Sequence, residues 1–99
     1  MTSTLHIEGS TLRWKDNLGR IHRDEDKPAV VFANGDMFWY QHGKLHRNND
    51  LPAVVRADSD MFWFQHGKLH RDNDLLAVVR ANGSKAWWHH GKCIREERP

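Results

Sequence analysis

Short apolar runs alternate with polar turn residues along this chain, and the pattern repeats every 24 residues. Each repeat holds an alanine–valine run and then an aromatic run. The alanine–valine runs cover residues 28–33, 52–57 and 76–81, and the aromatic runs cover residues 37–40, 61–64 and 85–88. Both kinds of run are short, rich in β-branched or aromatic residues, and bounded by Gly, Asn, Asp or Ser, which is typical of strands. No segment has a helical period of useful length. The pattern predicts an all-β domain, a single antiparallel, twisted meander sheet of stacked β-hairpins.

A heptapeptide marks the same point in every repeat. QHGKLHR occupies residues 41–47 and again 65–71, HHGKCIR occupies 89–95, and NLGRIHR occupies 17–23. We expect each His-Gly pair to form a two-residue turn, with His taking the left-handed conformation usually given to Asn. Asn34-Gly35 and Asn82-Gly83, between the two runs of a repeat, predict type I′ turns for the same reason.

The repeat divides the chain into units. Residues 1–23 form a degenerate N-terminal cap, residues 24–47, 48–71 and 72–95 form three clearer units, and residues 96–99 form a tail. Within the cap, the alternation at 5–8 and the Gly9-Ser10 pair predict a short strand and a turn that lead into a strand at 11–14. A shift of 24 residues places Trp14 under Phe38 and Gly19 under Gly43.

Side chains of one kind return to the same place in successive units. We expect one column of Trp39, Trp63 and Trp87 and a second of Tyr40, Phe64 and Trp88. One unit cannot bury its own apolar face, so these columns should bury area between neighbouring units. The sheet edges at the two ends favour a homodimer that pairs through an edge or a face.

The recurring positions resemble MORN-type repeats, in the divergent MORN-like form of many small bacterial and phage proteins. The matching residues are Trp39-Tyr40, Gly43-Lys44, His46-Arg47 and Pro52-Ala53, and then Trp63-Phe64, Gly67-Lys68 and His70-Arg71. The resemblance covers about residues 11 to 95, although Leu76 replaces the proline of the unit. It implies an elongated sheet of stacked hairpins that serves as a scaffold or binding surface, without catalytic activity.

Composition narrows the possible functions. The 99 residues carry 15 Lys+Arg and 13 Asp+Glu, a net charge of +2, which is too balanced for a binder that relies on charge alone to hold nucleic acid. The single cysteine, Cys93, excludes an intrachain disulfide and fits a reducing compartment. There is no readable signal peptide or membrane anchor, and we expect a cytoplasmic protein, in the host cytoplasm if a phage encodes it.

The eight histidines raise the question of a metal site. His42 and His46 are four residues apart, as are His66 and His70, but a hairpin turn does not place such a pair on one face as a helix does. No Cys or Glu completes a ligand set. The sequence therefore favours turn and stacking roles for the histidines, and the acidic loops 24–26 and 72–74 lack the Gly and distal Glu of a calcium loop. We expect no metal and no cofactor.

No arrangement of nucleophile, base and orienting group points to an enzyme. The sequence favours non-enzymatic binding of another protein, since Trp, Tyr and Arg dominate interface hot spots. One specific form is a phage-encoded inhibitor that occludes a bacterial host enzyme or a defence enzyme of the CRISPR type. The candidate partner-binding residues are Tyr40, Lys44, Arg47, Arg56, Phe64, Lys68, Arg71, Arg80 and Trp88.

Two other functions stay open at this level. The basic residues beside the aromatic ones would also suit single-stranded nucleic acid, through stacking and phosphate contacts. A structural or assembly component is the third possibility. No membrane partner is expected.

Overall fold

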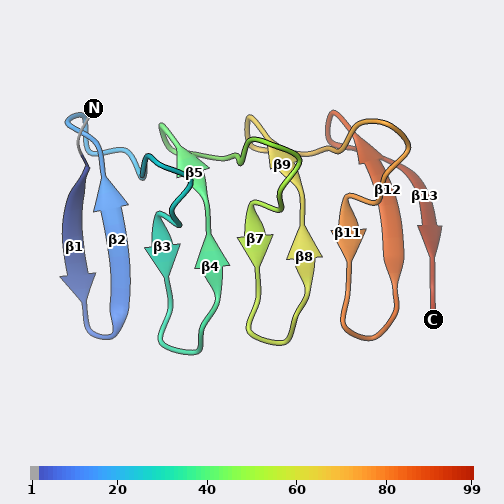
Figure 1. Cartoon of the computed structure of the whole chain (residues 1–99), viewed down its shortest axis with the longest axis horizontal. Helices are drawn as coiled ribbons and strands as arrows, with labels where there is room; N and C mark the ends of the chain where they lie inside the picture. The colour runs from blue at the N-terminus through green and yellow to red at the C-terminus, as the bar shows by residue number, and fades with distance from the viewer. Residues whose placement is uncertain (1–2) are drawn as a thin grey trace.

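The computed structural model describes residues 3–99, which form strands, turns and loops (Figure 1). No helix long and apolar enough to cross a membrane occurs in this part of the chain. The strands are β1 (Thr4–Glu8), β2 (Thr11–Lys15), β3 (Val30–Val31), β4 (Met37–Phe38), β5 (Tyr40–Gln41), β6 (Lys44–Leu45), β7 (Val54–Val55), β8 (Met61–Phe62), β9 (Phe64–Gln65), β10 (Lys68–Leu69), β11 (Val78–Val79), β12 (Lys85–His89) and β13 (Lys92–Glu97).

Nine of these strands form one antiparallel sheet in the order β1-β2-β3-β4-β7-β8-β11-β12-β13. Apart from the small hairpins β5–β6 and β9–β10, neighbours in the sheet follow chain order, so the predicted all-β meander is confirmed. The molecule measures 39 × 25 × 18 Å and is elongated along the direction in which the units succeed one another (Figure 1).

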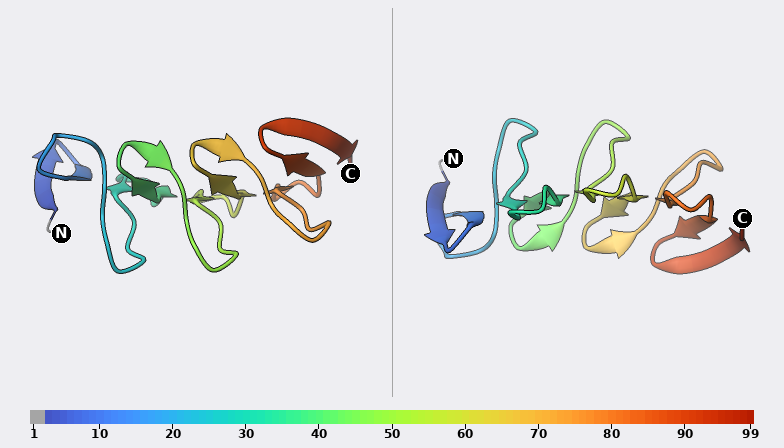
Figure 2. Two further views of the ribbon diagram at one scale, coloured as in Figure 1. Left: turned by 90° about the horizontal axis from the view of Figure 1, so that it is seen from above. Right: turned by 90° about the horizontal axis from the view of Figure 1, so that it is seen from below.

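The aromatic runs of the two central units are not single strands. The chain bends at Trp39 and at Trp63, so β5–β6 and β9–β10 leave the plane of the sheet. Figure 2 shows these hairpins on one side of the sheet and the polar loops that precede β7 and β11 on the other. The bend is stabilised by a hydrogen bond to the next unit, in which the Trp39 N–H donates to the Ala53 carbonyl at 2.7 Å. In the last unit β12 runs straight and pairs with β13 through a bulge between Trp87 and Trp88.

The two turn predictions fare differently. His42 and Gly43 both have positive φ, at 49° and 84°, and connect the paired residues Gln41 and Lys44, so the two-residue His-Gly turn is confirmed. The type I′ prediction for Asn34-Gly35 is wrong, because only Gly35 of that pair has positive φ. Gly35 N–H bonds to the Phe32 carbonyl at 3.0 Å, which gives a three-residue loop with glycine at its left-handed position. The Asn34 side chain instead accepts the Asp36 amide at 3.0 Å.

Trp39 and Trp63 are each closed in by an aspartate and an arginine of their own unit, a group that we call the Asp–Trp–Arg clasp. Arg47 lies over the Trp39 ring with its guanidinium carbon 3.8 Å from the ring centroid, and its Nε donates to Asp26 at 2.8 Å. The Trp39 indole N–H donates to the Asp26 carbonyl at 3.1 Å. The second clasp joins Asp50, Trp63 and Arg71 in the same way. Trp39 and Trp63 are each only 7% exposed as a result.

The N-terminal cap is out of step with the predicted frame by one residue. Trp14 takes the place of Trp39, not that of Phe38: its amide donates to the Ala29 carbonyl, and Arg23 lies 3.7 Å above its ring. The extra residue is absorbed in a wider turn, where Gly19 N–H bonds to the Asp16 carbonyl at 3.0 Å. The fixed 24-residue shift concealed this insertion, because it aligns Gly19, which follows the insertion, with Gly43 and so places Trp14, which precedes it, one residue out of register.

Pairing across the strands sorts the remaining side chains onto two faces. Val30, Phe38, Val54, Phe62, Val78 and Ala86 are paired in turn and share one face. Phe62, Val78 and Ala86 line a groove with Leu69 of β10, so this face is on the hairpin side. Three valines of this set are at most 7% exposed. Their neighbours Val31, Met37, Val55, Met61 and Val79 are paired in turn on the opposite face and are partly exposed. The three buried valines form the core together with Ala29, Ala53, Ala77, Ala86, Trp39 and Trp63.

The clasp predicts that Trp63, in a central unit, contributes more to the free energy of unfolding than Trp87, in the last unit. Trp63→Ala should lower the free energy of unfolding by about 3–5 kcal/mol, as expected for a large buried aromatic. Trp87→Ala should cost less than half of that, because Trp87 is partly exposed and Arg95, 5.1 Å from its ring, is itself 66% exposed. Urea unfolding of the two variants tests this, and equal losses would contradict it.

Candidate functional site

The histidines join successive units through their ring nitrogens. In each case the amide of a turn histidine donates to Nδ1 of a histidine in the preceding unit: His42 to His22 at 3.0 Å, His66 to His46 at 3.0 Å and His90 to His70 at 2.8 Å. The glycine that follows donates to a backbone carbonyl beside the same histidine, as Gly67 does to Leu45 at 2.8 Å. We call this pair of hydrogen bonds the turn-docking link.

The link fixes the tautomer of the accepting histidine. Because Nδ1 accepts a hydrogen bond, the proton of the neutral ring lies on Nε2. Nε2 in turn lies 2.8 Å from a side-chain oxygen two residues on, in Asp24, Asn48 or Asp72. The two rings across each link also lie close together, with centroids 4.2–4.7 Å apart; His22 and His42 are stacked, and the other two pairs are tilted. These contacts match the turn and stacking roles expected from the sequence.

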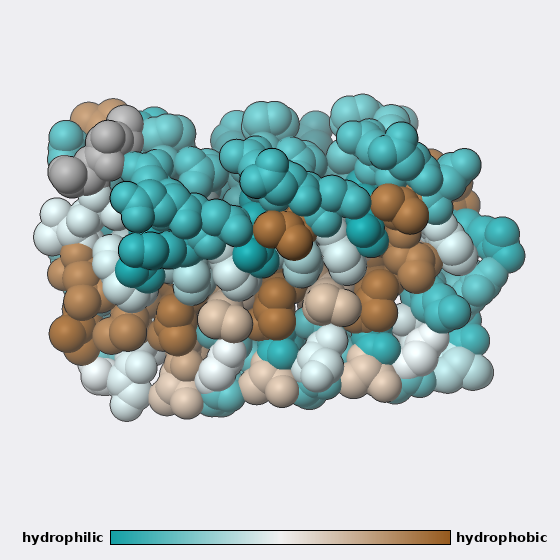
Figure 3. All heavy atoms as spheres, viewed as in Figure 1, coloured by the Kyte–Doolittle hydropathy of each residue, from teal (hydrophilic) through white to brown (hydrophobic). Residues whose placement is uncertain are grey.

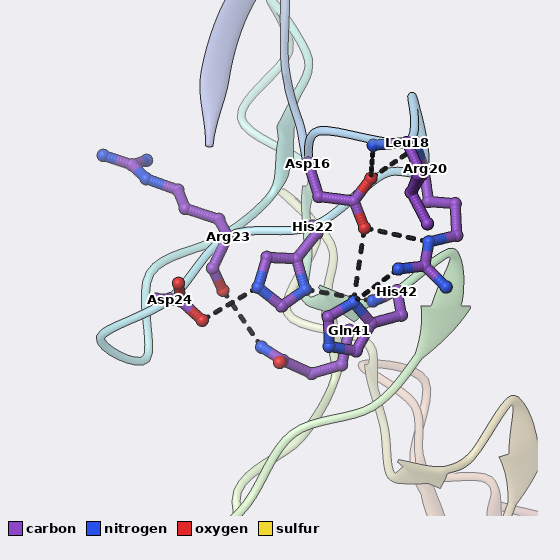
Figure 4. A network of polar contacts seen from close by, with 8 residues as sticks. All are labelled: Asp16, Leu18, Arg20, His22, Arg23, Asp24, Gln41 and His42. Atoms are coloured by element: carbon purple, nitrogen blue, oxygen red, sulfur yellow. Dashed lines mark hydrogen bonds and ion pairs between the residues drawn. The ribbon is translucent and has the colours of Figure 1, made fainter. Parts of the chain in front are cut away.

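The first link adjoins a polar network around Asp16 (Figure 4). Burial of Asp16 opposes its ionisation, but hydrogen bonds from the Arg20 amide, the His42 ring, the Leu18 amide and the Arg20 side chain outweigh it. They hold the pKa of this carboxyl well below its usual range. Asp16, His22 and His42 offer donor atoms within 4.8 Å of one another. Arg20 already neutralises this carboxylate at 2.9 Å, so the network needs no added cation.

The last link contains a third imidazole. His89 stands where the other units have Gln41 and Gln65, whose side-chain amides donate to the carbonyls of Arg23 and Arg47. Its ring centroid lies 4.5 Å from that of His70 and 4.3 Å from that of His90. Burial lowers the pKa of His90, and charge on His89 and His70 lowers it further.

Two of the predicted partner-binding residues belong to the scaffold. Arg47 and Arg71 form the clasps, and their side chains are only 15% and 18% exposed. Each also donates to a carbonyl of the next unit, Arg47 to Pro52 at 3.1 Å and Arg71 to Leu76 at 3.0 Å. Their charge is thus engaged within the chain.

Lys44 and Lys68 lie along the stack of hairpin turns. A Cβ added to Gly67 would lie 3.6 Å from Cβ of Lys44, and one added to Gly91 would lie 3.5 Å from Cδ of Lys68. The lysine stems thus pack against the next glycine, while both residues remain exposed.

The other candidates lie toward the hairpin side of the sheet. Arg56 and Arg80 have 47% exposed side chains and reach Asp36 and Asp60 at 3.9 and 3.5 Å. Trp88 lines a groove with Phe62, Leu69 and Arg80. Tyr40 and Phe64 occupy the corresponding place in the earlier units and are partly exposed.

Sequence reasoning missed the opposite face as a surface. Val31, Met37, Val55, Met61 and Val79, which we call the Val/Met row, cross five consecutive strands there. Leu12 pairs with Val31 and Ile7 with Leu12, so the row continues to β1, where Ile7 is 66% exposed. Figure 3 shows the apolar band across this face, below the polar loops. The signal was present, since the alanine–valine runs are apolar on both of their alternating faces.

Comparison of the chain with protein-family models, with curated proteins and with solved structures finds no match.

If the turn-docking link stabilises the fold, removing the histidine whose Nδ1 accepts it should lower the free energy of unfolding. His46→Leu should leave the His66 amide without its partner and lower the free energy of unfolding by about 1–3 kcal/mol. Ile94 occupies the same repeat position in the last unit, where no further turn docks, so Ile94→His should change stability little. Chemical denaturation of both variants compares them, and similar effects would argue against the link.

The hydrogen bond from the Ala57 amide to the Asp36 carboxylate should make the free energy of unfolding depend on pH. The Ala57 amide lowers the pKa of Asp36 despite burial of the carboxyl, with smaller contributions from Asn34 and Arg56. The unfolded chain therefore takes up the proton more readily, so the stability due to this carboxylate is present above about pH 4 and is lost below it. Asp36→Asn should lower the melting temperature at pH 7 and have a smaller effect at pH 3. A difference that is constant with pH would contradict this assignment.

Proposed function

We propose that this protein is a non-enzymatic binding module that engages a partner protein through the open face of its sheet. The observation that supports this proposal is the Val/Met row, which leaves partly exposed apolar side chains on five adjacent strands. Monomeric proteins rarely expose large contiguous apolar patches, and those that do often use them for recognition.

The dimensions of the face suit a protein better than a small ligand. The molecule extends over 39 by 25 Å along its two longer axes, and a standard interface takes about 800 Å² from each partner. The row follows the long direction of the molecule, so a partner that covers it would contact every unit. Methionine suits such a surface, because its flexible side chain adapts to the shape of the partner.

The arrangement of charge favours a protein over single-stranded nucleic acid. Arg47 and Arg71 are paired with Asp26 and Asp50 and are mostly buried, which removes two cations of the basic stripe from phosphate contact. The lowered pKa of each aspartate, held down chiefly by its arginine, keeps these pairs ionised at neutral pH.

A module of this kind would act by covering a surface of its partner. Our more specific proposal is inhibition by occlusion, in which the sheet face blocks the working surface of a bacterial host enzyme or defence enzyme. The hydrogen bonds that join successive units support this, since they restrain the face before binding and so reduce the entropy lost when it is covered.

The test uses a change that the repeat itself permits. Lys85 stands at the repeat position of Met37 and Met61, so Met61→Lys should fold normally. We expect affinity capture with mass spectrometry to recover a protein partner with the wild-type chain. Met61→Lys should weaken its binding at least about tenfold, as expected when a buried apolar side chain is lost from an interface.

A matched change on the other face is the control. Phe32 occupies the repeat position of Arg56, so Arg56→Phe is also permitted, and it should leave binding of the captured partner intact. Equal binding by Met61→Lys and the wild type would overturn the assignment of this face. A salt-dependent gel shift with short single-stranded DNA, without a captured protein, would favour the nucleic-acid alternative.

A further inference from the structure

The two outer strands of the sheet differ in how well they are protected against pairing with another strand. β1 and β13 lie at opposite ends of the sheet, and each is paired on one side only among residues 3–99 (Figure 1). The pairing of β13 contains a bulge, and the strand carries Arg95, Glu96 and Glu97, which are features that hinder the addition of a further strand. β1 forms five consecutive pairs with β2 without a bulge, and it contains neither lysine nor proline. The open edge is therefore that of β1.

The ladder between β1 and β2 determines which backbone groups face this edge. Residues opposite each other in an antiparallel pair alternate between hydrogen-bonded and non-hydrogen-bonded pairs. The Trp14 amide points away from β1 and donates to the Ala29 carbonyl at 2.9 Å. Leu5 lies opposite Trp14, so the two form a non-hydrogen-bonded pair. Leu5 and, two residues on, Ile7 therefore direct their N–H and C=O groups outward.

The side chains of the same two residues are apolar and exposed. Leu5 is 43% exposed and Ile7 is 66% exposed. Both lie on the face of the Val/Met row, because Ile7 is paired with Leu12 and Leu12 with Val31. Glu8, the acidic residue of β1, lies on the other face, where its carboxylate is 2.9 Å from the Arg13 guanidinium. Outward backbone groups and exposed apolar side chains thus coincide at two positions of β1.

We propose that β1 pairs antiparallel with β1 of a second copy of this chain, with His6 on the twofold axis. This register places Leu5 of each copy opposite Ile7 of the other, so the outward backbone groups of one copy meet those of the other. The apolar side chains of both copies then pack together on one face. On the other face Glu8 lies opposite Thr4, so no two carboxylates oppose each other. A shift by one residue would set outward-facing groups against inward-facing ones.

The assembly closes as a dimer. A twofold interface uses the same strand of both copies, so the edges that remain are the two protected β13 strands. Opposite residues of an antiparallel pair share a face, so the two Val/Met rows lie on the same side of the joined sheet. If this row is the binding face, as proposed above, the dimer offers two copies of it side by side, and a partner with two equivalent surfaces would be held at both.

The experiment is sedimentation velocity on the full chain, without any partner, up to roughly millimolar concentration. We expect a reversible equilibrium between monomer and dimer, without larger species. Leu5→Lys combined with Ile7→Lys places lysine opposite lysine and should weaken dimerisation at least about tenfold. Leu5→Glu combined with Ile7→Lys places a carboxylate opposite an ammonium group only in the proposed register. This variant should dimerise more tightly than the double-lysine variant.

The other edge of the sheet provides the matched control. Ile94 of β13 is 67% exposed, as Ile7 is on β1, so Ile94→Lys should dimerise as the wild type does. Because Leu5 and Ile7 are exposed, all variants should keep nearly the wild-type melting temperature at a dilution where the wild type is monomeric.

The proposal is overturned if the wild-type chain stays monomeric or if the double-lysine variant dimerises equally well. It is also overturned if the glutamate–lysine variant dimerises no better than the double-lysine variant, or if Ile94→Lys abolishes the dimer. These measurements contain no partner protein, and Met61→Lys should dimerise as the wild type does. Failure of the dimer is therefore distinguishable from failure of the proposed binding function.

Discussion

A hydrogen bond from a backbone amide to a histidine ring determines how the units of this protein are joined. In the two central units every strand is two residues long, so the sheet ladder alone supplies few hydrogen bonds per strand. The turn amides of His42, His66 and His90 point out of their own hairpins and need an acceptor in the preceding unit. Nδ1 of a neutral imidazole provides it, and its Nε2 proton then binds the following loop. One side chain thus connects a loop, a hairpin and the next hairpin.

This dependence explains where the repeat changes. The residues that link forward are His46, which receives a turn amide, and Asp36, which receives the amide of Ala57. At the same positions in the last unit the chain has Ile94 and Ser84. There, β13 takes the place beside β12 that β7 takes beside β4, with Glu96 and Glu97 in place of Val54 and Val55. Charged side chains on this outer strand discourage pairing with another sheet.

The periodic part of the fold could be predicted from the sequence, and the bends could not. Short β-branched and aromatic runs with turn residues between them were enough for the antiparallel meander and for the His-Gly turns. The same reasoning treated residues 61–64 as one strand, because alternation does not show that the chain turns at Trp63. That bend depends on the Ala77 carbonyl, which accepts the Trp63 amide from the next unit. Asn34-Gly35 was misassigned because the Asn34 side chain bonds to Asp36 and favours a longer loop.

The candidate site was harder to predict for a related reason. Arginine beside tryptophan is the composition of an interface, and Arg47 and Arg71 were expected to contact a partner on that basis. The two left-handed residues of each loop, such as Asn49 and Asp50, direct a carboxylate and a carbonyl toward the unit's own arginine and tryptophan. The contact is intramolecular, and only the positions of the loop atoms reveal it. Likewise, His89 is one of eight histidines in the sequence, and its proximity to His70 comes from the docking of one unit on another.

Comparing equivalent positions of the repeat shows which apolar residues the fold requires and which it does not, and the Val/Met row is the clearest case. Met37, Met61 and Lys85 occupy equivalent positions, each paired with a valine of the preceding strand. Because Lys85 is accommodated there, the backbone and its neighbours do not require an apolar side chain at this position. On the other face the equivalent comparison gives Phe38, Phe62 and Ala86, all apolar, as a covered face demands. Burial accounts for the apolar residues under the hairpins, whereas folding alone does not account for methionine at the two partly exposed central positions. This contrast between the two faces is the physical argument behind our proposal that the Val/Met row contacts another molecule.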